Sequence, residues 1–212
     1  MPPLVPYRFL VRLAHRCPYL GTKPKPGLEL PVAGLLRNRA ELDDRSNFAD
    51  VRTAWNEFGL MVSCEVSGKT RGVEVDPAKP KSSDGLSLWI DTRDARTSHR
   101  ASRYCHQFHL LPGGAGGSPQ VVQSKINRAQ IDAPMAEAKS ILIAEDTGKG
   151  RYRLSAFFPS TALTGFDPEQ HSRWGICYHV RDAELGDQFL GPNADFPFSD
   201  DPSLWDTLDL AK

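Results

Sequence analysis

The sequence has no excess of charge of either sign, because 26 basic side chains balance 26 acidic side chains among 212 residues. A neutral domain exerts no general electrostatic attraction on nucleic acid or on an anionic membrane surface. We therefore expect neither nucleic acid nor a membrane among its partners.

Long apolar runs are also missing. The most apolar N-terminal stretch, LVPYRFLV, is interrupted by Pro6 and Arg8, and it is followed closely by Arg12, His15 and Arg16. A signal peptide needs an uninterrupted apolar segment before a small-residue cleavage site, and a transmembrane helix needs about 20 apolar residues. The sequence therefore predicts a cytoplasmic protein.

Cysteine is scarce, and no two cysteines form a CxxC pair; the four are Cys17, Cys64, Cys105 and Cys177. Disulfides accumulate in exported proteins, and a chain of this length builds a core without them. Reduced thiols are therefore favoured over two disulfide bonds. Cys64 shares its phase with Val62 and Val66, which predicts a small buried apolar group.

No amphipathic helix longer than two turns is indicated, and period-two alternation of apolar residues predicts strands instead. Their expected positions are 7–13, a hairpin over 51–66, and 84–94, 104–110, 124–130, 138–145, 152–158, 173–180 and 204–210. Many short strands separated by turn signals are typical of an all-β, antiparallel two-sheet β-sandwich with a jelly-roll-like arrangement. One short helical turn is expected after Pro159.

Two parts of the chain differ in composition. Residues 1–47 are rich in proline and glycine, including the stretch TKPKPG, and show little periodicity. We expect them to form an N-terminal wrap or extension. Residues 48–212 contain the regular strand patterns and are expected to form the sandwich, with both parts in one structural domain.

The most informative stretch is DGLSLWIDTRD, residues 84–94. Leu86, Leu88 and Ile90 occupy one face of the predicted strand, so Trp89 lies on the other. Acidic residues stand before and after this strand. An aromatic plate framed by carboxylates suits a flat polar ligand such as a sugar, although a covering layer would bury the same face.

The acidic residues around this strand also offer oxygen ligands to a calcium ion, which takes six to eight of them. The candidates are Asp84 and Asp94 first, then Asp91, Asp182 and Glu184. No EF-hand spacing is present. The alternative is that these side chains cap turns and pair with Arg93, Arg96 or Arg100.

A dense polar segment covers residues 99–109. Cys105, His106 and His109 have no spacing typical of a zinc site, and on a strand His106 points away from the other two. Arg100 and Arg103 could instead hold an anionic group through paired hydrogen bonds. The remaining alternative is a polar outer strand face.

The four tryptophans divide into two pairs. Trp55 and Trp174 are in phase with apolar neighbours, which predicts core packing. Trp89 and Trp205 are open to either role, core packing or stacking against the apolar face of a sugar ring.

The order of several sequence blocks resembles that of the family 9 carbohydrate-binding modules and the wider DOMON-like sandwiches. The blocks are AWNEFGLMVSCEV, DGLSLWIDTRD, YRLSAFFPSTALTGF, WGICYHVRDAE and a closing strand with Leu208 and Leu210, which together span residues 48–210. The resemblance implies an antiparallel sandwich without catalytic activity, sugar binding between aromatic side chains, and structural calcium near acidic loops. The family's sugar-binding tryptophans have no residue-by-residue match here.

These observations predict a non-catalytic module for a carbohydrate or sugar-like ligand. Trp89 would stack on the ligand, and the other predicted contacts are Asp91, Arg103, His106, Gln107 and Trp205. An alternative is a cytoplasmic protein-interaction or assembly domain on the same scaffold. A metal-dependent enzyme that uses the histidines and aspartates is a third possibility.

Overall fold

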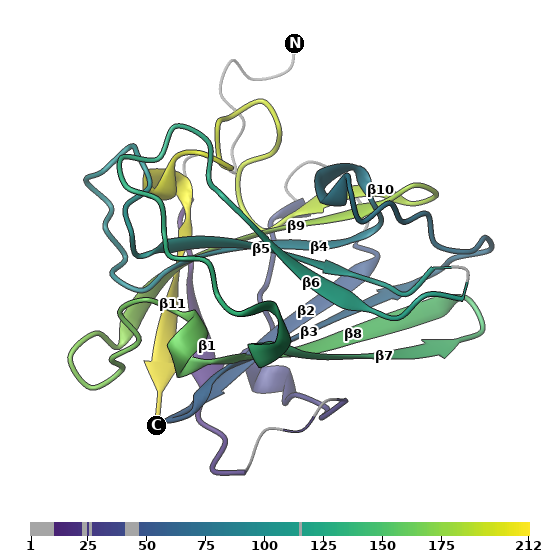
Figure 1. The fold of residues 1–212 in the computed structure, drawn as a ribbon, viewed down its shortest axis with the longest axis horizontal. Coiled ribbons are helices and arrows are strands. Elements are labelled where there is room, and N and C mark those ends of the chain that lie inside the picture. Colours follow the sequence, from purple (N-terminus) through teal and green to yellow (C-terminus); the bar gives the residue numbers. More distant parts are fainter. Residues whose placement is uncertain (1–10, 23–24, 26, 41–46, 115) are drawn as a thin grey trace.

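The computed structural model describes residues 11–22, 25, 27–40, 47–114 and 116–212, and within them two β-sheets pack face to face (Figure 1). The larger sheet has the strand order β1-β11-β9-β4-β5-β6, with β10 paired to β9. The smaller sheet has the order β2-β3-β8-β7. The predicted all-β, two-sheet sandwich is confirmed.

The strands are β1 (Ala14–Pro18), β2 (Ala49–Asn56), β3 (Gly59–Ser67), β4 (Gly85–Asp91), β5 (Cys105–Leu111), β6 (Gln120–Ser124), β7 (Leu142–Gly148), β8 (Arg151–Pro159), β9 (Arg173–Asp182), β10 (Gly186–Phe189) and β11 (Asp206–Ala211). Short 3-10 turns connect some of them: η1 (Val32–Gly34), η3 (Pro80–Ser82), η4 (Ala138–Ser140), η5 (Ser160–Ala162) and η6 (Pro202–Leu204). The helical turn expected after Pro159 is η5.

The β2–β3 hairpin forms where the sequence predicts it. In its turn, the side chain of Asn56 accepts a hydrogen bond from the backbone N–H of Phe58, at 3.0 Å. Gly59 has a φ of +154°, and a Cβ at this position would lie 2.0 Å from the carbonyl oxygen of Phe158. Only glycine therefore allows β3 to start this close to β8.

The main core lies between the two sheets. It receives the inward-facing residues of the central strands, among them Leu88, Phe108 and Tyr178 of the larger sheet and Val62 and Leu154 of the smaller one. Each fully buried side chain of this size contributes about 1.5–3 kcal/mol by leaving water. Trp55 and Trp174 are both buried, and Cys64 is fully buried, as their phase predicts.

Some elements differ from the sequence prediction. The strand expected over 7–13 lies partly outside the described residues, and β1 begins only at Ala14 and pairs with β11 in parallel. The strand expected over 124–130 is wrong, because β6 ends at Ser124 and a turn follows in which Arg128 has a φ of 57°. The segment 138–145 is divided between η4 and the start of β7.

Each sheet is covered on its outer face as well. Leu28 and Leu30 pack with Ala54 and Met61 on the outer face of the smaller sheet. On the outer face of the larger sheet, a second apolar cluster lies beneath the loops that follow β4, β6 and β10. This second cluster decides which aromatic side chains a ligand can reach.

Candidate functional site

The outer face of the larger sheet carries Trp89, the tryptophan that was predicted to stack on a ligand. Trp89 on β4 pairs with Gln107 on β5 and with Cys177 on β9, so the three side chains share one face. Trp205, just before β11, belongs to the same cluster. The structure therefore brings together four of the predicted contacts: Trp89, Asp91, Gln107 and Trp205.

Both tryptophans are covered by loops. Trp89 is 3% exposed and Trp205 is 1% exposed, because residues from the surrounding loops pack over them, including Ala101, Ile126 and Phe198. The ring of Phe198 meets Trp89 edge to face at 5.4 Å between centroids, and Trp205 donates from Nε1 to the carbonyl of Phe198. These tryptophans act as core residues in this structure, and no ligand ring can stack on them without displacing the loops.

Asp91, a predicted ligand contact, and Asp94, a predicted metal ligand, stabilise the turn after β4. Asp91, buried at the end of β4, accepts hydrogen bonds from the backbone N–H groups of Arg93 and Ala95. Burial raises the pKa of Asp91, and these two N–H groups act against that rise. Asp94 accepts from the hydroxyl of Thr207 and pairs with Arg96. Both carboxylates therefore have internal partners.

The remaining predicted contacts lie elsewhere. His106 points to the opposite face from Gln107, where its Nε2 accepts a hydrogen bond from the backbone N–H of Thr164 and its ring stacks on Phe108. Arg103 is exposed, with its guanidinium 6.0 Å from the ring centroid of Tyr104. The predicted set is therefore divided among two sheet faces and a surface loop.

A histidine that the prediction did not select organises the polar part of this outer face. His109 lies between two hydroxyls, with Nδ1 2.8 Å from Ser87 Oγ and Nε2 2.9 Å from Ser124 Oγ. Burial lowers its pKa to about 4, and the nearby positive charges of Lys81 and His179 add to this effect. The ring is therefore neutral at neutral pH and links three neighbouring strands.

The two predicted metal ligands do not meet. Asp84 precedes β4 and Asp94 follows it, and a strand of this length separates them by roughly 20 Å. One ion cannot bind both. No group of three or more metal-binding side chains occurs within the described residues.

Asp84 instead faces a buried ammonium group. Lys69 Nζ lies 2.5 Å from Asp182 Oδ2, 3.6 Å from Asp84 Oδ2 and 4.0 Å from Glu184 Oε2. The Asp84 carboxylate also accepts from the backbone N–H groups of Glu74 and Ala183. This ammonium supplies the positive charge that the buried carboxylates need.

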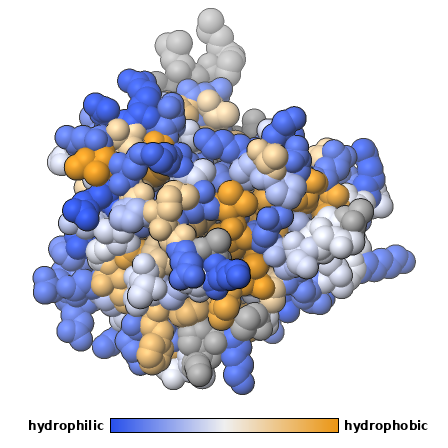
Figure 2. All heavy atoms as spheres, in the orientation of Figure 1, coloured by the Kyte–Doolittle hydropathy of each residue, from blue (hydrophilic) through white to orange (hydrophobic). Residues whose placement is uncertain are grey.

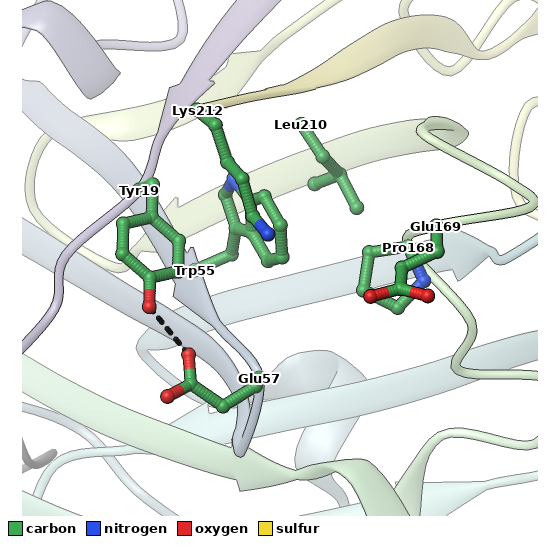
Figure 3. Close-up of a pocket in the computed structure, with 7 residues that line it drawn as sticks. All are labelled: Tyr19, Trp55, Glu57, Pro168, Glu169, Leu210 and Lys212. Carbon is green, nitrogen blue, oxygen red and sulfur yellow. Dashed lines mark hydrogen bonds between the residues drawn. The ribbon is translucent and has the colours of Figure 1, made fainter.

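A different aromatic pair lines a pocket at the edge where the two sheets meet (Figure 3). Tyr19 follows β1 and forms a parallel bridge with Trp55 of β2, and its backbone N–H donates to the carbonyl of Ala211 at the end of β11. The pocket has a volume of about 250 Å³ and is lined by Tyr19, Trp55, Glu57, Pro168, Glu169, Leu210 and Lys212.

The pocket combines flat apolar walls with carboxylates. The rings of Tyr19 and Trp55 meet edge to face at 5.2 Å, and Figure 3 shows Pro168 and Glu169 across the space from them. Tyr19 donates its hydroxyl hydrogen to Glu57 Oε2 at 2.6 Å. This bond is the largest cause of the lowered pKa of Glu57, to which the Lys212 ammonium also contributes.

Sequence reasoning missed this pocket. Trp55 was correctly predicted as a core residue, since it is 4% exposed, yet its edge still reaches the pocket wall. Its partners Tyr19 and Lys212 come from distant parts of the chain. Their approach depends on the bridge between β1 and β2 and on the β1–β11 pairing, for which no local pattern gives a signal.

A third surface feature is apolar. Figure 2 shows a mainly polar face with apolar side chains gathered over β6 and the segment that leads to β7. Ile131, Met135 and Leu142 are 57%, 56% and 41% exposed. The protein-interaction alternative would use this strip.

Among the described residues, no helix has the length and apolar character to cross a membrane.

Comparison with known proteins supports the fold alone. No protein-family model matches the sequence, and no curated protein matches it. A family 9 carbohydrate-binding module from Caldicellulosiruptor kristjanssonii in complex with cellotriose has a TM-score of 0.65 at 13% identity, covering 93% of each chain. A structure of a module of that family from the same organism with glucose has a TM-score of 0.64 at 12% identity, covering 94% of this chain and 96% of the other. The protein has the sandwich fold of the family 9 carbohydrate-binding modules, as the order of its sequence blocks predicts.

Proposed function

We propose that this protein is a non-catalytic carbohydrate-binding domain whose ligand occupies the pocket between Tyr19, Trp55 and Glu169. The observation that carries the proposal is the pocket itself, in which two aromatic side chains lie beside the carboxylates of Glu57 and Glu169. The likeness in fold to modules solved with cellotriose and glucose supports the same ligand class.

The chemistry of the walls suits a sugar ring. The C–H face of a pyranose packs against flat apolar surface, which the half-buried Tyr19 and Pro168 supply together with the edge of Trp55. Ionised carboxylates accept strong hydrogen bonds from hydroxyl groups. The Glu169 carboxylate makes no hydrogen bond or ion pair within the described part of the chain, so it is available to a ligand.

Glycoside hydrolysis also uses two carboxylates at one site, and the charge state of Glu57 excludes this residue from the role of the acid. A glycosidase needs one carboxylic acid with a raised pKa to protonate the leaving oxygen. The pKa of Glu57 is lowered by the hydrogen bond from Tyr19, so this group stays ionised at neutral pH. It is suited to accept hydrogen bonds and unsuited to act as the acid.

The test is a titration with glucose and cellotriose, followed by protein NMR, on the wild type and on Glu57→Gln and Glu169→Gln. A charge-assisted hydrogen bond contributes about 1.5–3 kcal/mol, so each substitution should weaken binding tenfold or more. Glu137→Gln is the matched control, because this exposed carboxylate does not line the pocket.

Trp89→Phe is the second control, since it keeps a buried ring on the outer face of the larger sheet. Unchanged binding in both controls is expected. Absence of binding by every sugar tested, or loss of binding in Trp89→Phe alone, would overturn the proposal for this pocket.

A further inference from the structure

The pocket already holds an organic ammonium group, which belongs to the protein itself. Lys212 Nζ lies 5.7 Å from the ring centroid of Tyr19 and 5.9 Å from that of Trp55. Cations within about 6 Å of an aromatic face are attracted by the ring quadrupole. Figure 3 shows the Lys212 side chain running across Trp55 into this space.

The charges of the lining residues favour a cation further. Glu57 and Glu169 each carry a negative charge, and Lys212 provides the one positive charge among the seven lining residues. If the exposed Lys212 side chain rotates out of the pocket, two carboxylates and two aromatic rings face the ligand. A neutral sugar would then meet acceptors and rings only, whereas an amine would gain charge-assisted hydrogen bonds and cation–π attraction.

The size of the pocket limits the ligand. A volume of about 250 Å³ is below the usual range of about 300–1,000 Å³ for small-molecule sites, so the pocket suits a single sugar residue. Resting on the proposed function, we infer that the pocket selects a sugar residue with a free amino group, such as a 2-amino-2-deoxyhexose, and that Lys212 occupies the position of this amine when no ligand is bound.

The inference makes Lys212 an internal competitor of the ligand. Removing its side chain should strengthen binding of an amino sugar, because the ligand no longer displaces an ammonium from the rings. The same change should strengthen binding of a neutral sugar less, since that ligand also no longer displaces the side chain but gains nothing from the loss of its positive charge. Lys149→Ala is the matched control, because it removes one positive charge from an exposed turn outside the pocket.

The experiment compares glucosamine, glucose, N-acetylglucosamine and choline by NMR titration at pH 6, where the amine of glucosamine is protonated. We expect glucosamine to bind at least tenfold more tightly than glucose or N-acetylglucosamine. Lys212→Ala should increase this ratio several-fold, Lys149→Ala should leave it unchanged, and the double variant Glu57→Gln with Glu169→Gln should abolish it.

The outcomes separate this inference from the proposed function. Equal affinity for glucose and glucosamine would overturn the amine preference and leave sugar binding intact. Binding of choline without binding of any sugar would overturn the proposed function, and with it the choice of an amino sugar. Weaker glucosamine binding in Lys212→Ala would overturn the role of Lys212 as a competitor.

Discussion

Two regions of this molecule gather aromatic side chains, and they differ in what lies over them. On the outer face of the larger sheet, Trp89 and Trp205 are covered by loops that bring Phe198 and Ala101 onto them. At the edge of the sandwich, the half-buried ring of Tyr19 lines an open pocket, which the buried Trp55 reaches only with its edge. An aromatic residue on the outward face of a strand is therefore reachable only if the loops leave that face open.

The polar groups of the two regions differ in the same way. On the sheet face, Asp91 and His109 have partners from their own sheet and its loops. In the pocket, Glu169 has no partner within the described residues, and Glu57 accepts from a tyrosine hydroxyl at the surface. The sheet face pairs its polar groups internally, whereas the pocket leaves the Glu169 carboxylate without an internal partner among the described residues.

The largest effect of a single substitution should come from removing a covered tryptophan. Trp89→Ala should cost about 3–5 kcal/mol of unfolding free energy, as for other large core aromatics, while sugar binding by the folded protein stays unchanged. Urea denaturation and the sugar titration measure the two quantities. Trp89→Phe should cost less, because Trp89 Nε1 is buried without a hydrogen-bond partner among the described residues. A stable Trp89→Ala protein that no longer binds sugar would reverse the roles of the two regions.

The second effect is a loss of stability in acid that originates in the larger sheet. Burial lowers the pKa values of His106 and His109 from 6.5 to about 4. Above pH 6.5 both rings are neutral in the folded and unfolded states. Between pH 6.5 and 4 the unfolded chain binds protons that the folded protein excludes, so stability falls as the pH falls.

The size of this effect follows from the two pKa values. Each histidine should cost about 3 kcal/mol at pH 4, at about 1.4 kcal/mol per tenfold change in proton affinity. Denaturation curves from pH 7 to pH 4 should show a smaller loss for His109→Asn than for the wild type. Parallel curves for the two proteins would show that His109 is not protected from protonation.

A smaller effect is expected in the pocket. Tyr19→Phe removes the hydroxyl that donates to Glu57, so the pKa of Glu57 should rise toward its ordinary value. The stability should change little, because the bond is exposed to solvent. An NMR titration of the Glu57 side chain checks the shift. An unchanged pKa would mean that this hydrogen bond does not set the charge state of the pocket.

The smallest effect is expected on the apolar strip. Met135→Ser should change the unfolding free energy by no more than about 0.5 kcal/mol, because this side chain is 56% exposed. Sugar binding should also remain as in the wild type. A clear loss of affinity in this variant would move the binding surface away from the Tyr19–Trp55 pocket.

Most of the fold could be predicted from local patterns. The β2–β3 hairpin, β4, β5, β8 and β9 all appear where alternating residues and turn signals place them. The short strand β10 has too few residues for a periodic signal, and β1 is recognisable only through its parallel partner β11. The strand expected after Ser124 failed because a turn interrupts an otherwise suitable sequence.

The candidate site was predicted only in part. The phase of Trp89 placed it correctly beside Gln107 on the outer face, and its burial depends on residues such as Phe198 that are more than 100 positions away. The pocket depends on Tyr19, Trp55 and Lys212, which no short pattern connects. Both results have the same cause, which is that local periodicity reports the side of a strand and carries no information on what covers that side.

The sequence by itself determined the class of the fold, the faces of the central strands and the neutral charge of the domain, because alternation and composition are local properties. Only the tertiary structure decided that the tryptophans of the larger sheet are buried and that an aromatic pocket with two carboxylates lies at the edge of the sandwich. Exposure and the grouping of distant side chains are set by long-range strand pairing and loop packing, and these are properties of the whole chain.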